Sequence, residues 1–196
     1  MIDKPLKKNR NYQRTSLRAP YFESILYTDK NFVFKARALN ISEGGLLLDQ
    51  VPHLPVESDS ISMMISLTQY PYFKNFNLER LENFSTDMLR NTIVRVQGEI
   101  VRTFEVANKI DEAFVKRIGV KFISIDRDRE LLIKDYVNTF SSNLIHLQIL
   151  IDTLNSKRSN IKKIRILSSI LGYQVDLKMS LLYKKVQYDY KSLQWI

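Results

Sequence analysis

Apolar and polar residues follow one pattern in the first two thirds of the chain and another in the last third. As far as residue 125, short runs that alternate, or that are rich in aromatic and branched side chains, stand between turn residues, which is typical of β-strands. This pattern predicts six strands, over residues 21–27, 32–40, 46–48, 61–67, 92–106 and 114–125. Short antiparallel strands joined by turns indicate a small barrel, because closure of the sheet removes its exposed edges.

Two features interrupt this barrel pattern. Gly98 lies inside the fifth predicted strand, where a glycine indicates a bulge or a close approach to the backbone. Residues 70–91 are rich in aromatics and have apolar positions three and four apart, which favours a short amphipathic helix inserted in a strand connection. The insertion could cover the barrel, contact a partner or line a ligand site, and core packing is the role that we expect.

From residue 126 onward apolar residues recur at intervals of three and four, so the predicted structure becomes helical. A long helix is expected over residues 127–155, with Asp126 or Asp128 as its N-cap. This helix is longer than the barrel alone could cover. Its remaining apolar stripe should therefore pack on the chain's own tail or on a second subunit, which would make a homo-oligomer through the C-terminal helices.

The tail, residues 156–196, is predicted to be a basic, helical extension. One helix is expected from Ile161 to a stop at Gly172, because glycine is common just after the end of a helix. From Val175 onward, apolar intervals of four, three and four favour another helix. Alternating apolar residues between 175 and 181 leave a strand open as the other interpretation.

The formal net charge of the 196-residue chain is +9, and the positive charge is concentrated at the two ends. Residues 1–18 contain six Lys or Arg against one Asp, and residues 156–196 contain nine against two Asp. Residues 1–13 are also polar and aperiodic, which predicts a flexible arm leading into the barrel. Positive ends suit an anionic ligand, nucleic acid or a membrane surface.

Candidate binding chemistry lies in the six residues from Asn40 to Gly45, between two apolar runs. Asn40 and Ser42 carry short polar side chains that can bond to nearby backbone or to a ligand. Gly44 and Gly45 allow positive φ and lack a Cβ, so another group can approach the backbone closely. On their own, these residues predict a hairpin turn between two strands.

A pair of arginines upstream changes this interpretation. Arg14 and Arg18 are four residues apart, and Asn-x-Ser-x-x-Gly follows them at Asn40, Ser42 and Gly45. Together the two elements resemble the signature of the PilZ family of cyclic di-GMP receptors, which is Arg-x-x-x-Arg followed by Asp/Asn-x-Ser-x-x-Gly. The segments around Gly98 and Gly119 also resemble the late strands of a PilZ barrel, and the resemblance extends over roughly residues 10–135.

The resemblance implies a six-stranded antiparallel barrel over residues 14–126, followed by a helix. It does not cover the tail, so the full expectation of a mainly β fold with the long helix and a helical C-terminal extension rests, for residues 156–196, on apolar spacing alone. The resemblance further implies a receptor that binds cyclic di-GMP and needs no cofactor. We expect nucleotide binding to order the N-terminal arginine arm on the barrel, because the arm's composition is that of a flexible segment. The signal would then pass to a downstream protein partner that the sequence does not name.

The resemblance also assigns residue roles. Arg14 and Arg18 would clamp phosphate and guanine, because a guanidinium pairs with phosphate oxygens and with the guanine Hoogsteen edge. Asn40 and Ser42 would bond the guanine or hold the loop, and Gly45 would leave room for the ligand. Further candidate neighbours of the ligand are Arg10, Gln13, Gly44 and Arg102.

An enzyme is not expected. The chain has no cysteine, and therefore no thiolate metal site and no cysteine nucleophile. His53 and His146 are isolated from any nucleophile and from any metal-ligand spacing. No glycine-rich phosphate loop of the Walker or Rossmann type occurs either.

Location and alternative functions follow from the same composition. No apolar run is long enough to span a bilayer, and the first residues lack the apolar core of a signal peptide, so a cytoplasmic protein is expected. One alternative is a PilZ-like interaction module that binds no nucleotide. The other is a basic nucleic-acid-binding protein, which is disfavoured because the aromatic residues of the tail are scattered and do not form a stacking platform.

Overall fold

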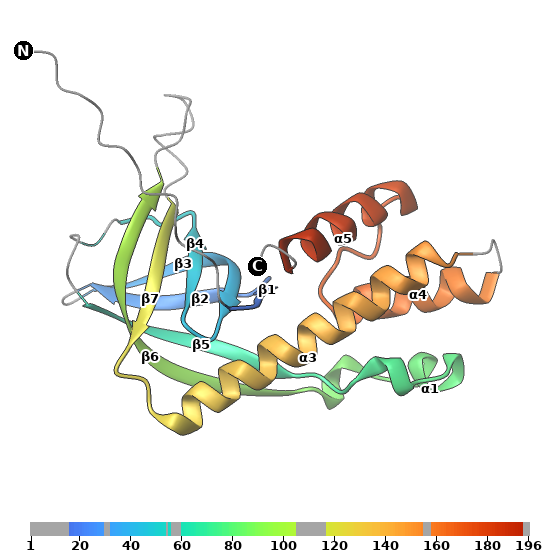
Figure 1. Ribbon diagram of the computed structural model, residues 1–196, viewed down its shortest axis with the longest axis horizontal. Helices are drawn as coiled ribbons and strands as arrows, with labels where there is room; N and C mark the ends of the chain where they lie inside the picture. The colour runs from blue at the N-terminus through green and yellow to red at the C-terminus, as the bar shows by residue number, and fades with distance from the viewer. Residues whose placement is uncertain are drawn as a thin grey trace, which may run out of the picture.

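A computed structural model describes residues 16–29, 32–53, 55, 60–104, 117–154 and 158–193 (Figure 1). The predicted arm, residues 1–13, lies outside this part of the chain. The strands are β1 (Arg18–Pro20), β2 (Ser24–Asp29), β3 (Phe32–Ser42), β4 (Gly45–Asp49), β5 (Ser60–Gln69), β6 (Arg90–Phe104) and β7 (Arg117–Ile123). The helices are α1 (Leu78–Glu82), α3 (Arg127–Asp152), α4 (Arg158–Ile170) and α5 (Met179–Leu193), with single 3-10 turns η1 (Phe73–Asn75) and η2 (Thr86–Met88).

Six strands close into an antiparallel barrel, as the sequence predicts. Their order is β3-β2-β5-β6-β7-β4, and β4 pairs back to β3. The short strand β1, which was not predicted from the sequence, pairs with β3 over residues 40–42, while β2 pairs with the same edge over residues 32–37. β1 and β2 therefore act as one interrupted strand, and a hydrogen bond from Tyr21 N to Leu39 O (3.1 Å) bridges the interruption.

Alternation along the strands divides the barrel into a buried inner face and an outer face that is mostly exposed. One row of directly paired residues crosses five strands on the inner side, and all of its members are buried: Ala19, Ile41, Leu46, Val120 and Ile100. The residues on either side of this row point outward.

At Gly98 another group lies close to the backbone, and the strand has no bulge at this residue. A Cβ on Gly98 would lie 2.3 Å from Val120 Cγ1 inside the barrel. The residue stays in register with its neighbour Phe122 on β7, and the register shift of this strand pair comes later, between Ile100 and Arg102. The glycine is therefore needed because the core is filled at that point.

The insertion at residues 70–91 packs mainly beside the helices, and its residues Phe73 and Leu81 belong to the buried core, as expected. Phe73 is fully buried and makes edge-to-face contacts with the rings of Phe76 and Phe84, at centroid distances of 5.3 Å. Asn143 of α3 holds the segment, because its side chain accepts from Phe73 N and donates to Pro71 O, both at 2.9 Å. Figure 1 shows α1 beside α4, at the end of the molecule away from the barrel.

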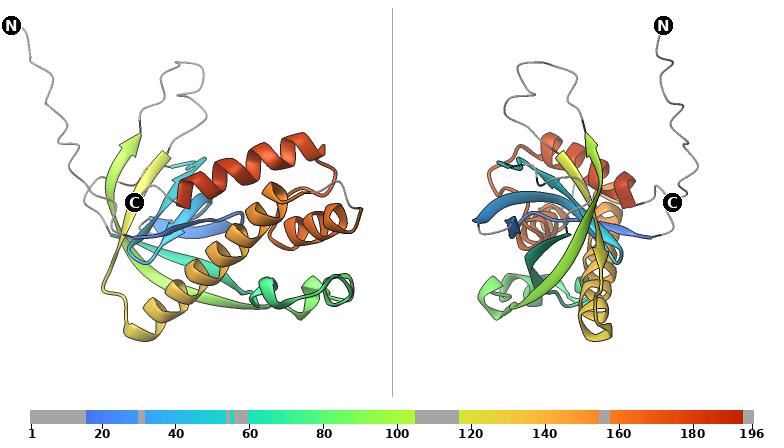
Figure 2. Two further views of the ribbon diagram at one scale, coloured as in Figure 1. Left: turned by 45° about the vertical axis from the view of Figure 1, so that its right-hand side comes forward. Right: turned by 90° about the vertical axis from the view of Figure 1, so that its left-hand side faces the viewer.

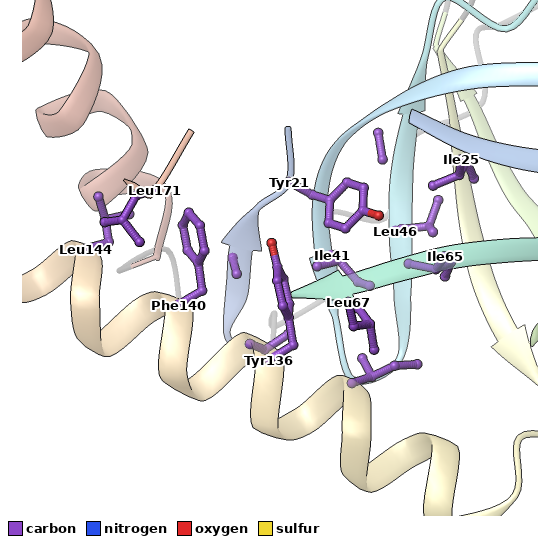
Figure 3. Close-up of a cluster of buried hydrophobic side chains, with 14 of the residues drawn as sticks. Tyr21, Ile25, Ile41, Leu46, Ile65, Leu67, Tyr136, Phe140, Leu144 and Leu171 are labelled. Carbon is purple, nitrogen blue, oxygen red and sulfur yellow. The ribbon is translucent and has the colours of Figure 1, made fainter. Parts of the chain in front are cut away.

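The long helix α3 begins where the sequence predicts. The Asp126 side chain caps it by accepting from Arg129 N at 2.9 Å. Its first half closes one end of the barrel, where the ring of Tyr136 meets that of Tyr21 and the ring of Phe140 stacks on that of Tyr136 (Figure 3). Its second half contacts the tail, with Leu144 against Leu171, so the apolar stripe that exceeds the barrel packs on α4 and α5.

The tail consists of two helices, as the stronger of the two sequence interpretations predicts. α4 is followed by Gly172, which has the positive φ of 90° that favours glycine after a helix. Residues 174–178 form a turn, which excludes the alternative strand, and Val175 remains 69% exposed. Figure 2 shows α5 running beside α3, with α4 and the insertion at the far end from the barrel.

Candidate functional site

The predicted binding motif forms the β3–β4 hairpin. Ser42 and Gly45 are directly paired across it, with Glu43 and Gly44 as the turn. The Ser42 hydroxyl is buried and donates to Gly45 O at 3.0 Å. Of the two roles that the resemblance allows for Ser42, the geometry therefore shows the one that holds the loop. Glu43 also ties the turn to α3 through Lys134, at 3.7 Å.

The hairpin meets the second predicted element at β1. Arg18 is directly opposite Ser42, and Pro20 is opposite Asn40, so the three polar residues share the outer face of the barrel. Arg18 is half-buried there. The structure thus brings together four of the five principal residues of the predicted site: Arg18, Asn40, Ser42 and Gly45.

The two glycines of the hairpin differ in their surroundings. A Cβ on Gly45 would lie 2.1 Å from the carbonyl oxygen of Val120, whereas a Cβ on Gly44 would meet nothing within 4 Å. Neither glycine has a positive φ. The space beside Gly45 is therefore filled by the backbone of β7, and the glycine is required for barrel closure whether or not a ligand is bound.

Asn40 carries the unsatisfied polar group of this face. Its Oδ1 atom is buried and accepts no hydrogen bond from the described residues. A buried acceptor without a donor costs about 1–3 kcal/mol, and such atoms are few in folded proteins. Its position beside Arg18 and Ser42 makes it a ready acceptor for an N–H group brought by a ligand.

Several cations share the outer face with the motif. Lys121 is exposed and directly opposite Gly45, and Arg37 lies opposite Asp49 at the other end of the hairpin. The Asp49 carboxylate is buried and accepts from Arg117 Nε at 2.8 Å. Lys121 was not predicted to be a site residue, because its position beside Gly45 depends on the β4–β7 register, which no local sequence pattern indicates.

Among the remaining predicted residues that the structure describes, Gly44 belongs to the hairpin turn and Arg102 is not part of this group. Arg102 lies in the same row as Asn40 but three strands away, about 14 Å across the sheet. Its guanidinium is 5.6 Å from the ring of Phe104. Arg10, Gln13 and Arg14 lie outside the described residues.

Phe22 connects β1 to the C-terminal helices. Its ring lies 5.3 Å from that of Tyr173 and 6.2 Å from that of Phe140, between centroids. Lys185 Nζ of α5 lies 5.6 Å from both the Phe22 and the Tyr173 rings. Arg18 is thus only four residues from a side chain that contacts the tail.

A buried hydrogen bond supports this contact from the tail side. The Tyr173 hydroxyl donates to Asp189 Oδ2 of α5 at 2.9 Å. Burial, and then the nearby Asp189 carboxylate, raise the pKa of Tyr173, and burial raises the pKa of Asp189 above its ordinary value. The tyrosine therefore stays a neutral donor at ordinary pH, and α5 is held in place beside Phe22.

A groove of about 990 Å³ lies away from the candidate site, in the insertion. Its walls come from residues 69–90, including Phe76, Phe84 and Met88, and Arg80 is stacked on Phe76 at 3.9 Å. The motif residues of β1, β3 and β4 do not line it. We therefore place the candidate site on the outer face of the barrel and not in this groove.

The described residues provide no group of three or more His, Asp or Glu side chains that could hold a metal ion. His53 is stacked on Phe34 at 5.3 Å. Burial, and then the nearby Lys163, lower the pKa of His146 below its ordinary value. In the part of the chain that the structure describes, no helix is long and apolar enough to cross a membrane.

The model of the PilZ domain family matches residues 8–139. This chain belongs to the PilZ domain family. The family commonly binds cyclic di-GMP, and its members are typically receptor domains without catalytic activity. The match includes the whole barrel and the first half of α3, and it leaves the rest of α3, α4 and α5 outside.

Solved structures show distant likeness only. The Escherichia coli PilZ domain of YcgR with c-di-GMP is 12% identical, with a TM-score of 0.44, over 72% of this chain and 99% of that chain. The Bacillus subtilis inhibitor of motility, MotI/DgrA, is 11% identical with a TM-score of 0.44 over 64% of this chain. The match covers 49% of that protein, so this PilZ chain spans about half of its length.

A third structure, an uncharacterised Legionella protein, is 13% identical with a TM-score of 0.29, over 69% of this chain and 94% of that chain. No curated protein matches this chain.

Proposed function

We propose that this PilZ protein is a receptor for cyclic di-GMP and that the nucleotide binds on the outer face of β1, β3 and β4. The observation that carries the proposal is the meeting of Arg18 with the Asn40–Gly45 hairpin, beside a buried Asn40 Oδ1 that accepts no hydrogen bond from the described residues. Within the family signature, the arginines and the Asn-x-Ser-x-x-Gly segment are the ligand-binding elements.

Each group has chemistry that suits one part of the ligand. The guanidinium of Arg18 can pair in a bidentate manner with a phosphate or with guanine O6 and N7. Asn40 Oδ1 can accept from a guanine N–H, which would satisfy its unpaired atom. Lys121 adds a positive charge next to the hairpin. Arg14 is the second arginine of the signature and would complete the clamp.

The binding test is calorimetric titration with cyclic di-GMP. Loss of a charge-assisted hydrogen bond costs about 1.5–3 kcal/mol, so Arg18→Ala and Arg14→Ala should each weaken binding by about 10- to 150-fold. Arg95→Ala is the matched control, because Arg95 is an exposed strand arginine on β6, which pairs with β5 across the barrel from the hairpin. A folded wild type that does not bind would refute the proposal, and so would equal losses in all three variants.

We further propose that binding orders the arm that carries Arg14 and that the change reaches the tail through Phe22. The support for this is positional, because Arg18 begins β1 and Phe22 packs on Tyr173 and Lys185 just after it. Ligand should increase amide-exchange protection of residues 8–20 and change it in α4 and α5. Phe22→Ala should keep binding but remove the change in α4 and α5. Unchanged exchange of residues 8–20 in a protein that binds would refute the ordering step.

A further inference from the structure

The outward face of α5 carries a ridge of two exposed apolar residues next to lysines. Leu181 is 49% exposed and Tyr188 is 73% exposed. Lys184 and Lys191 are exposed beside them, at the helical spacing that places all four on one stripe about 15 Å long. The opposite face holds the helix on the protein, through the buried residues Leu182, Val186 and Leu193.

The charge on this stripe has a single sign. The exposed residues of α5 are Ser180, Leu181, Lys184, Gln187, Tyr188 and Lys191, and none of them is acidic. The single carboxylate of the helix, Asp189, is turned inward to Tyr173. Just before the helix, the exposed residues Asp176 and Lys178 carry opposite charges and offset each other. The two lysines of the stripe therefore favour an anionic occupant.

Three kinds of anionic or apolar occupant are poor matches. A second copy of α5 would place lysines against lysines. A nucleic acid is normally held by arginines and by several stacking aromatics, whereas α5 contains no arginine and shows one exposed tyrosine on this stripe. A protein partner would meet a face rich in lysine, the residue that protein interfaces tend to exclude.

We propose that the outward face of α5 docks on an anionic phospholipid bilayer surface. Lysines next to an acidic leaflet are each drawn to it, the tyrosine ring suits the headgroup level, and Leu181 enters the boundary with the acyl chains. Figures 1 and 2 show α5 along the outside of the molecule. This inference does not depend on nucleotide binding.

The test is co-sedimentation of the full chain with vesicles of phosphatidylcholine alone and of phosphatidylcholine with about one third phosphatidylglycerol. Binding is expected to the second kind only, and it should fall as salt is raised. Each lysine near the surface contributes roughly fivefold in partitioning, so Lys184→Gln with Lys191→Gln should weaken it about 30-fold. At high salt the lysines are screened and the apolar contact remains, so Tyr188→Ser should weaken the residual vesicle binding of the protein there.

The matched control is Lys35→Gln with Arg95→Gln, which makes the same change in net charge at two exposed positions on barrel strands. Circular dichroism checks that every variant is folded. Equal loss in the control would show that net charge alone drives binding, and it would overturn the proposal. No binding of the wild type to acidic vesicles would also overturn it, as would stripe-dependent binding to DNA or RNA oligonucleotides in the absence of vesicle binding.

Discussion

Replacing Gly45 by alanine tests whether this glycine serves barrel closure or ligand access. The added Cβ would lie 2.1 Å from Val120 O, which is about 1.3 Å inside the 3.4 Å at which ordinary contact begins. Two further backbone atoms, Val120 C and Lys121 Cα, lie at 3.2 Å. Because all three belong to the backbone of β7, no side chain can rotate away, and two paired strands of a closed barrel must separate.

The expected cost follows from this geometry. Overpacking in a well-filled structure typically destabilises by about 1–3 kcal/mol, and moving a strand backbone belongs at the upper end of that range. For a protein of this size the melting temperature should fall by about 2 to 12 °C. Gly44→Ala is the control, because a Cβ there meets nothing within 4 Å and the backbone has no positive φ.

The assay is urea unfolding of the two variants beside the wild type, with calorimetric titration of cyclic di-GMP on the same samples. We expect Gly45→Ala to lower the free energy of unfolding and Gly44→Ala to leave it within about 0.5 kcal/mol. A Gly45→Ala variant of full stability that has lost ligand binding would refute this reasoning. That result would mean that the glycine is needed only for access of the ligand.

Three other predictions concern buried polar groups. Asn40→Ala should leave the free energy of unfolding unchanged or slightly raised, because it removes a buried acceptor without a donor. The affinity for cyclic di-GMP should fall about tenfold or more. Urea unfolding and calorimetric titration check the two results, and a clear loss of stability would contradict the first. Asn143→Ala should lower the free energy of unfolding in urea by about 2–4 kcal/mol, because it leaves the amide of Phe73 and the carbonyl of Pro71 unpaired. Asn138 is exposed on the same helix, so Asn138→Ala should change the free energy of unfolding little. Burial raises the pKa of Tyr70 from 10.0 to about 12, so the folded state holds this proton more tightly than the unfolded state. The stability that results is complete below pH 10 and should be lost as the pH rises toward 12, and urea midpoints measured across that range should fall less steeply for Tyr70→Phe than for the wild type.

The sequence predicts most of the elements because their signals are local. The alternation of β6, the cap at Asp126 and the glycine after α4 each need only a few neighbouring residues. β1 is different, because three residues ending in Pro20 have no pattern of their own. They become a strand because the end of β3 offers them an unpaired edge.

The candidate site also has features that depend on local sequence and features that depend on long-range pairing. The Asn-x-Ser-x-x-Gly spacing correctly predicts a hairpin, since Ser42 and Gly45 bond across one turn. The reason for the glycine is not local, because it depends on Val120 of a strand far along the chain. The position of Lys121 beside the hairpin follows from the same register. The motif therefore predicts the hairpin itself, whereas the residues that lie beside the hairpin depend on long-range strand pairing.

The contact between Phe22 and Tyr173 is the route by which the proposed site and the C-terminal helices would be thermodynamically linked. Arg18 and Phe22 belong to one short segment, and that segment contacts the hairpin on one side and Tyr173 on the other. If the nucleotide changes how firmly α4 and α5 are docked, then docking must change nucleotide affinity by the same factor. Phe22→Ala would weaken docking without touching the hairpin, so any shift in its dissociation constant for cyclic di-GMP measures this coupling. Weaker nucleotide binding by this variant would mean that the bound protein docks α4 and α5 more firmly, and tighter binding would mean that it docks them less firmly.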